Sequence, residues 1–191
     1  MSKTRVDAFS DGVFAIAITL LVINLLAIHD RLAHHWPEYA AFAFSFLTIG
    51  VMWVNHHHLM NQFARADRVF LFLNLMLLMG IVFIPFPTAL IGEHIRDGGA
   101  RGAAIAYGCT GIYLSIFFGA LWHYGRTHVL REDADPKEVS GITRSYLPGM
   151  PLYLTGTLIA IGSPVGSAIF FGAIAVFYGV SNTFFGKEPT D

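Results

Sequence analysis

The sequence predicts an all-α integral membrane protein with six transmembrane helices, and three observations lead to this fold class. The 191 residues are 54% hydrophobic and only 13% charged, with a mean hydropathy of +0.56, which is too apolar for an ordinary soluble domain. The apolar residues form six long runs separated by short polar links. The basic residues are concentrated in alternate links, as is typical of cytoplasmic loops.

Polar links and prolines delimit the predicted helices. Pro37 suits the first turn of the second helix, where its missing N–H needs no partner. Pro85 and Pro87 should kink the third helix, and Pro136 would begin a short surface helix before the fifth. We expect one membrane domain over residues 1–191, with helices at about 5–28, 37–62, 69–91, 101–124, 145–162 and 165–185, most of them long enough to cross a hydrocarbon core of roughly 30 Å.

The positive charges predict the orientation in the membrane. With the N-terminus inside, nine of the twelve basic residues fall in inner segments, and only Arg31, Arg96 and Arg101 fall in outer links. We therefore expect a multi-pass protein of the cell membrane with both termini cytoplasmic. The net charge of −1 suggests no nucleic-acid partner, and the single Cys109 excludes an intrachain disulfide.

The first predicted helix carries one narrow aliphatic stripe. At 100° per residue, Phe9, Gly12, Ile16, Leu20 and Ile23 share this stripe, and Thr19 lies on its flank. Asp11 lies about 140° from Ile16, so it must find hydrogen-bond donors on a neighbouring helix. The stripe alone leaves open whether it lines a pore or packs on lipid or another helix.

A set of polar residues is expected at one depth of the membrane. Asp11 lies near the inner end of the first helix, the second helix brings His56 and His57 to the same level, and Asn74 lies a turn or two into the third. Buried polar groups in lipid must be satisfied internally, and this set can satisfy itself.

Consecutive histidines point 100° apart, so we predict no metal site. No nucleophile–base pair or paired carboxylates stand out, so we predict no enzyme.

Three motifs carry a family resemblance: Arg5-x-x-x-Phe9-Ser10-Asp11 with the apolar run after it, Trp53-x-x-His56-His57, and Leu73-Asn74. Together they resemble the signature of the transmembrane protein 175 family of potassium channels, in its prokaryotic single-repeat form. The resemblance is close over the first half of the chain. It implies six helices per subunit and a homotetramer whose first helices line a central pore, without a selectivity-filter loop.

The resemblance also implies roles for individual residues. The pore constriction would be formed by Ile16, with Leu20 and Ile23 as further rings, and Thr19 would join Ile16 in selectivity. The structural polar network behind the pore would comprise Arg5, Phe9, Ser10, Asp11, His56, His57 and Asn74. No cofactor is expected, only the permeant potassium ion.

Three points stay open at this stage. Asp30 would either ring the pore mouth or be a solvated loop acid. A proton channel or proton-coupled transporter using Asp11 with His56 or His57 is the alternative function. A non-conducting membrane scaffold is the third possibility.

Overall fold

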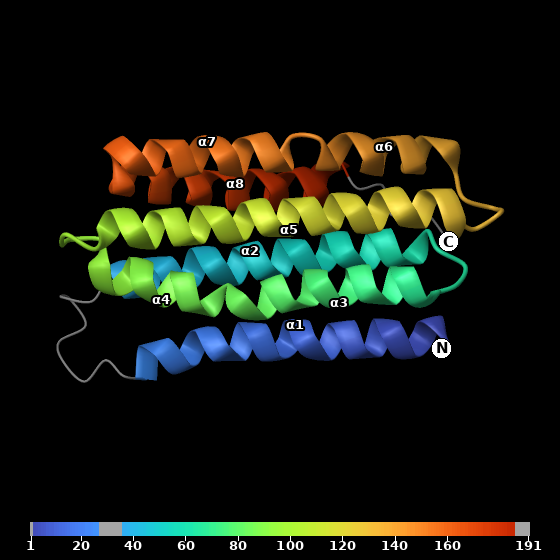
Figure 1. Cartoon of the computed structure of the whole chain (residues 1–191), viewed down its shortest axis with the longest axis horizontal. Coiled ribbons are helices and arrows are strands. Elements are labelled where there is room, and N and C mark those ends of the chain that lie inside the picture. The colour runs from blue at the N-terminus through green and yellow to red at the C-terminus, as the bar shows by residue number, and fades with distance from the viewer. Residues whose placement is uncertain (1, 27–35, 186–191) are drawn as a thin grey trace.

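The computed structural model describes residues 2–26 and 36–185, and its helices run side by side along one long axis (Figure 1). Apart from one isolated β-bridge between Phe63 and Leu130, the regular structure of these residues is helical. The helices are α1 (Lys3–Leu26), α2 (Trp36–Asn61), α3 (Arg68–Phe83), α4 (Pro85–His94), α5 (Ala100–His128), α6 (Pro136–Tyr146), α7 (Gly149–Gly162) and α8 (Pro164–Phe185).

Four helical segments of the described residues are long and apolar enough to cross a membrane. They are Lys3–Ile23 in α1, Trp36–Asn61, Arg68–His94 and Ala100–His128. The segment Arg68–His94 consists of α3 and α4, which follow one another in a single row in Figure 1. In the same view α6 and α7 lie end to end, and α8 lies beside α7. The all-α expectation is confirmed.

Two of the predicted helices have different boundaries in the structure, and a proline is the cause in each case. The third predicted helix, 69–91, is two helices, because Pro85 begins α4 directly after Ile84. The fifth predicted helix, 145–162, begins at Gly149 instead, because Pro148 has no N–H to donate to the Arg144 carbonyl and so interrupts the helix between α6 and α7. The short helix predicted at Pro136 is present as α6. Its N-terminus is capped by Asp135, which accepts a hydrogen bond from the backbone N–H of Lys137 at 2.8 Å.

One face of α1 packs into the core of the subunit. Val6, Ser10, Phe14, Ala17 and Leu21 are all buried, and their spacing of three or four residues places them on one side of a helix. This face lies against α2, α3 and α4. The rotation of α1 is therefore fixed, and its remaining faces point out of the subunit.

Two glycines bring α5 and α7 close together. A Cβ at Gly108 would overlap Thr157, and one at Gly111 would overlap the ring of Tyr153. Small residues at such crossings let helix backbones approach in membranes. Gly119 has open space where a Cβ would lie, so it does not serve this packing.

The link between α2 and α3 is bonded to the link after α5. Ala64 N–H donates to the carbonyl of Val129 at 2.9 Å, and Arg131 N–H donates to that of Gln62 at 2.9 Å. Asp67 caps α3 by accepting from the backbone N–H of Phe70 at 2.9 Å and also accepts from the Tyr124 hydroxyl at 2.8 Å. The first of these hydrogen bonds is the main cause that lowers the pKa of Asp67.

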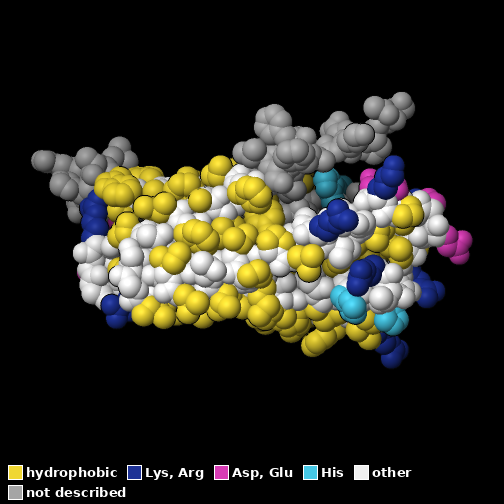
Figure 2. All heavy atoms as spheres, turned by 90° about the horizontal axis from the view of Figure 1, so that it is seen from above, with side chains coloured by type: hydrophobic (Ala, Val, Ile, Leu, Met, Phe, Trp, Pro, Cys, Tyr) yellow, Lys and Arg dark blue, Asp and Glu magenta, His cyan; other side chains and the backbone are white. Residues whose placement is uncertain are grey.

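The two ends of the bundle differ in charge. The N-terminus, the α2–α3 link and the α5–α6 link share one end, and the α4–α5 link and α7–α8 turn share the other (Figure 1). Figure 2 shows apolar side chains over most of the visible face, while most of its histidine, acidic and basic side chains gather toward the first end. The grouping of links agrees with the alternation that the sequence predicts.

Candidate functional site

The aliphatic stripe of α1 lies outside the core of its own subunit. Ile16 is 57% exposed, Ile23 56% and Phe9 53%, while Leu20 is half-buried. By the helical repeat, Ile16 lies about 120° from the buried Ser10. The stripe therefore faces out of the subunit, toward lipid, another subunit or a pore.

Thr19 is exposed beside this stripe. Its hydroxyl donates to the backbone carbonyl of Ile16 at 2.8 Å, a back-bond that serines and threonines form readily in helices. The donor is thereby used within the helix, and the oxygen keeps acceptor capacity toward the outside. Thr19 thus offers an acceptor oxygen one turn along α1 from Ile16.

A buried polar cluster ties α1, α2 and α3 together through Asn74. The Asn74 amide nitrogen donates to the Ser10 hydroxyl oxygen at 3.1 Å, and its carbonyl oxygen bonds Nε2 of His56 at 2.8 Å. The Ser10 hydroxyl in turn donates to the carbonyl of Val6 at 2.9 Å. Because the Asn74 oxygen only accepts, Nε2 of His56 carries the proton. The three side chains thus satisfy one another without water.

Asp11 belongs to a separate contact. Its carboxylate accepts a hydrogen bond from the indole N–H of Trp53 on α2 at 2.8 Å. The Trp53 ring lies 6.1 Å from that of His57, measured between centroids. The expected polar set is therefore divided between a buried cluster and a contact on the exposed side of α1 and α2.

The remaining predicted site residues lie apart from the buried cluster. Arg5, Phe9 and His57 are exposed on the subunit, and their part in a network stays a prediction. Asp30 lies outside the described residues. Trp53 was not predicted as a partner of Asp11, although it stands in the second motif. An indole N–H needs an acceptor when it lies within a membrane. That requirement could have indicated a carboxylate partner for Trp53 from the sequence alone.

No metal site is proposed for this region. Within residues 2–26 and 36–185, no group of three or more His, Cys, Asp or Glu side chains is placed to hold an ion. In the buried cluster Ser10, His56 and Asn74 are joined by direct hydrogen bonds, so it is suited to packing the helices rather than to coordination.

Membrane-length helices, an apolar outer surface and an internally satisfied polar cluster define an α-helical multi-pass membrane protein. A family model described as "Endosomal/lysosomal potassium channel TMEM175" matches residues 5–85. A potassium channel of Chamaesiphon minutus is 43% identical over 162 residues, covering 78% of this chain and 80% of the relative. A potassium channel of Streptomyces collinus is 40% identical over 188 residues, covering 92% and 90%.

A solved structure gives the same result. The crystal structure of a lysosomal potassium-selective channel TMEM175 homolog from Chamaesiphon minutus superposes with a TM-score of 0.84 at 38% identity, covering 93% of this chain and 96% of that one. The chain belongs to the TMEM175 family. This is a family of channels rather than of enzymes.

Proposed function

We propose that the protein is a potassium-selective, leak-type channel in which four copies place their α1 helices around a central pore. The outward exposure of the aliphatic stripe of α1 is the observation that carries this proposal, together with the similarity to proteins named potassium channels. Each subunit would cross the membrane six times, by α1, α2, α3 with α4, α5, α6 with α7, and α8.

The stripe would supply successive rings along the pore. Ile16 would form the narrowest ring, with Leu20 and Ile23 following toward the outer end. The sequence has no Thr-Val-Gly-Tyr-Gly segment, so a cage of backbone carbonyls is not available for selectivity. Narrow aliphatic rings gate by expelling water, whereas wider rings pass a partly hydrated ion. The Thr19 oxygen beside the constriction would then favour one cation over another.

The polar contacts of α1 would hold these rings in place. Ser10 is bonded within the buried cluster, and Asp11 is bonded to Trp53. Both contacts lie near the same end of α1 and on faces away from Ile16. They fix the rotation of the helix, so the stripe can face the axis without a polar group in the constriction.

In the proposed orientation both termini lie in the cytoplasm. The α4–α5 link lies on the extracellular side of the cell membrane. The excess of basic residues in the proposed inner segments supports it. The grouping of the N-terminus and the α2–α3 and α5–α6 links at one end is compatible with it.

The proton-relay alternative receives less support. A relay requires hydrogen-bonded neighbours, but the carboxylate of Asp11 is bonded to Trp53, whereas His56 is bonded to Asn74. The two groups therefore have different partners within the subunit, and no second function is proposed.

The proposal is tested by reversal potentials of purified protein in planar bilayers with paired potassium and sodium solutions. Ile16→Asn should hydrate the narrowest ring, raise conductance and reduce the preference for potassium. Ile18→Asn is the control, because Ile18 is half-buried and lies about 160° from Ile16 on the helix. If both variants conduct alike with unchanged selectivity, α1 does not line the pore.

Thr19→Val provides a second test of the same pore. The substitution removes the hydroxyl but keeps the shape, so the pore should stay intact while the potassium preference shifts. A reversal potential equal to that of the unmodified protein would remove Thr19 from the selectivity determinants.

A further inference from the structure

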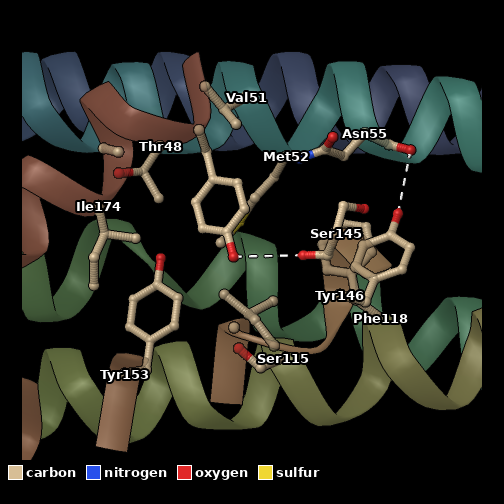
Figure 3. Close-up of a pocket in the computed structure, with 14 residues that line it drawn as sticks. Thr48, Val51, Met52, Asn55, Ser115, Phe118, Ser145, Tyr146, Tyr153 and Ile174 are labelled. Atoms are coloured by element: carbon tan, nitrogen blue, oxygen red, sulfur yellow. Dashed lines mark hydrogen bonds between the residues drawn. The ribbon is translucent and has the colours of Figure 1, made fainter. Parts of the chain in front are cut away.

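A cavity that is partly open to the surface lies in the bundle where α6 passes into α7. It has a volume of about 70 Å³ and is walled by α2, α5, α8 and the α6–α7 junction (Figure 3). It lies behind α2, away from the stripe of α1. The proposed conduction pathway does not use it.

Three tyrosine hydroxyls at this cavity lack good hydrogen bonds. Tyr153 is only 7% exposed, its hydroxyl points into the cavity (Figure 3), and it makes no hydrogen bond among the described residues. Tyr178 donates to the carbonyl of Ser145, and Tyr146 to that of Asn55, each at 3.5 Å. These distances are at the outer limit for an O–H donor. Tyr146 and Tyr178 are half-buried, whereas Tyr153 is buried, and a buried tyrosine hydroxyl normally has a close partner.

The rest of the lining is neutral and largely apolar. None of the 14 lining residues drawn in Figure 3 is acidic, basic or histidine. Met52, Leu114 and Ile174 supply aliphatic and thioether surface, while the Ser145 carbonyl supplies an acceptor. A charged ligand would lose its hydration here without a counter-charge, so the occupant must be neutral.

The volume restricts the size of the occupant. A cavity of 150 Å³ holds benzene, so one of about 70 Å³ encloses roughly three heavy atoms. The polar requirement is one oxygen that can accept from Tyr153. The same group should donate to an acceptor such as the Ser145 carbonyl, which accepts the 3.5 Å bond from Tyr178 and has a second lone pair. A hydroxyl group on a short alkyl chain meets both conditions.

We propose that this cavity is a binding site for a small neutral alcohol. The alcohol oxygen accepts a hydrogen bond from Tyr153, its own proton goes to the Ser145 carbonyl or a neighbouring tyrosine oxygen, and its alkyl part lies against Leu114 and Ile174. Such a ligand bridges α7, the α6–α7 junction and α8. The proposal concerns binding alone and does not depend on ion conduction.

The test uses ¹³C-labelled ethanol, which has three heavy atoms, as the probe, followed by ¹³C NMR with the full-length protein in lipid nanodiscs and with empty nanodiscs as reference. We expect a saturable bound component that empty nanodiscs lack. Ser115→Leu places an aliphatic side chain in the cavity and should weaken binding at least about tenfold. Thr155→Leu is the matched control, since Thr155 has the same kind of helical back-bond but is exposed on α7.

Tyr153→Phe tests the hydrogen bond while keeping the wall of the cavity. It should weaken binding about tenfold, the loss expected for one buried hydrogen bond, and far-UV circular dichroism checks that every variant remains helical. A signal that rises linearly, as in empty nanodiscs, means that the alcohol does not bind to the cavity and overturns the proposal. Equal affinity of Ser115→Leu and the unmodified protein overturns it as well. Either outcome leaves the channel proposal untouched, because no ion flux is measured.

Discussion

Asn74 shows how one amide can join three helices in a membrane. It donates to Ser10 on α1 and accepts from His56 on α2, while its own backbone belongs to α3. All three side chains are buried, so water cannot replace a lost partner and each group depends on the other two.

Asn74→Leu should destabilise the fold strongly for its size. The substitution keeps the branched shape but is bulkier and leaves the His56 N–H without an acceptor, which alone costs about 1–3 kcal/mol. Asn61→Leu is the control, because Asn61 is exposed at the end of α2. The measurement is the thermal unfolding midpoint in detergent, monitored by circular dichroism. Equal midpoints for the two variants would show that the buried cluster contributes little to stability.

The sequence predicted how deep in the membrane the polar side chains lie. It did not predict which neighbouring helix each of them faces. Depth predicted that Asp11, His56, His57 and Asn74 lie at one level, and in the structure His56 and Asn74 are hydrogen-bonded to each other. Ser10, which only the family resemblance added to this set, bonds Asn74. The helical repeat predicted that His56 and His57 point about 100° apart. The rotation of α2 against α1 depends on packing along its whole length. For that reason, the pairing of Asp11 with Trp53 was not predicted.

At the scale of whole helices, the break between α3 and α4 shows what the sequence could and could not predict. The break at Ile84 frees backbone groups that lipid cannot satisfy. The group that Pro85 frees is the Ile81 carbonyl four residues earlier, and the N–H of Ile84 donates to it at 3.2 Å. Beyond the break, the Thr88 hydroxyl donates to the Ile84 carbonyl at 2.8 Å. The Thr88 hydroxyl also lies 2.7 Å from that of Ser45 on α2. Pro85 is visible in the sequence, but this network exists only in the folded bundle, so a single kinked helix was expected.

The crossing of α5 and α7 gives a prediction at the same scale. Gly108→Ala should destabilise the protein by about 1–3 kcal/mol, because the added methyl overlaps Thr157 and forces the helices apart. Gly119→Ala on the same helix meets open space and should be neutral or stabilising by roughly 0.5–1 kcal/mol, as alanine favours helix. Thermal unfolding of both variants in detergent is the measurement.

A rescue variant makes the cause of this loss specific. Thr157→Ala removes the hydroxyl that overlaps the new methyl but leaves the Cβ of residue 157 and the Phe171 ring beside it, so the double variant Gly108→Ala with Thr157→Ala should recover part of the lost stability. If Gly108→Ala is as harmless as Gly119→Ala, the α5–α7 contact does not require a glycine at residue 108.

At the scale of the whole molecule, the distribution of basic residues and the arrangement of the helices agree on which links lie on the same side of the membrane. Counting basic residues divides the links into an inner and an outer set. The fold gathers the described links of each set at one end of the bundle. The assignment of one end to the cytoplasm is based only on the distribution of basic residues. The orientation is therefore the property of the whole molecule that most needs a direct measurement.

Cysteine labelling of intact cells provides that measurement. The native Cys109 is exposed within α5, so it is first replaced by alanine. Single cysteines at Arg31 and Arg96 should then react with a membrane-impermeant maleimide, because both are predicted to lie outside. Cysteines at Arg65 and Lys137 should react only after permeabilisation, because the basic links that contain them favour the cytoplasm. Arg65 and Lys137 are both exposed on the subunit, so burial cannot explain protection there. The reverse pattern would show that the bundle is inserted the other way round, with the proposed inner end of the pore facing outward.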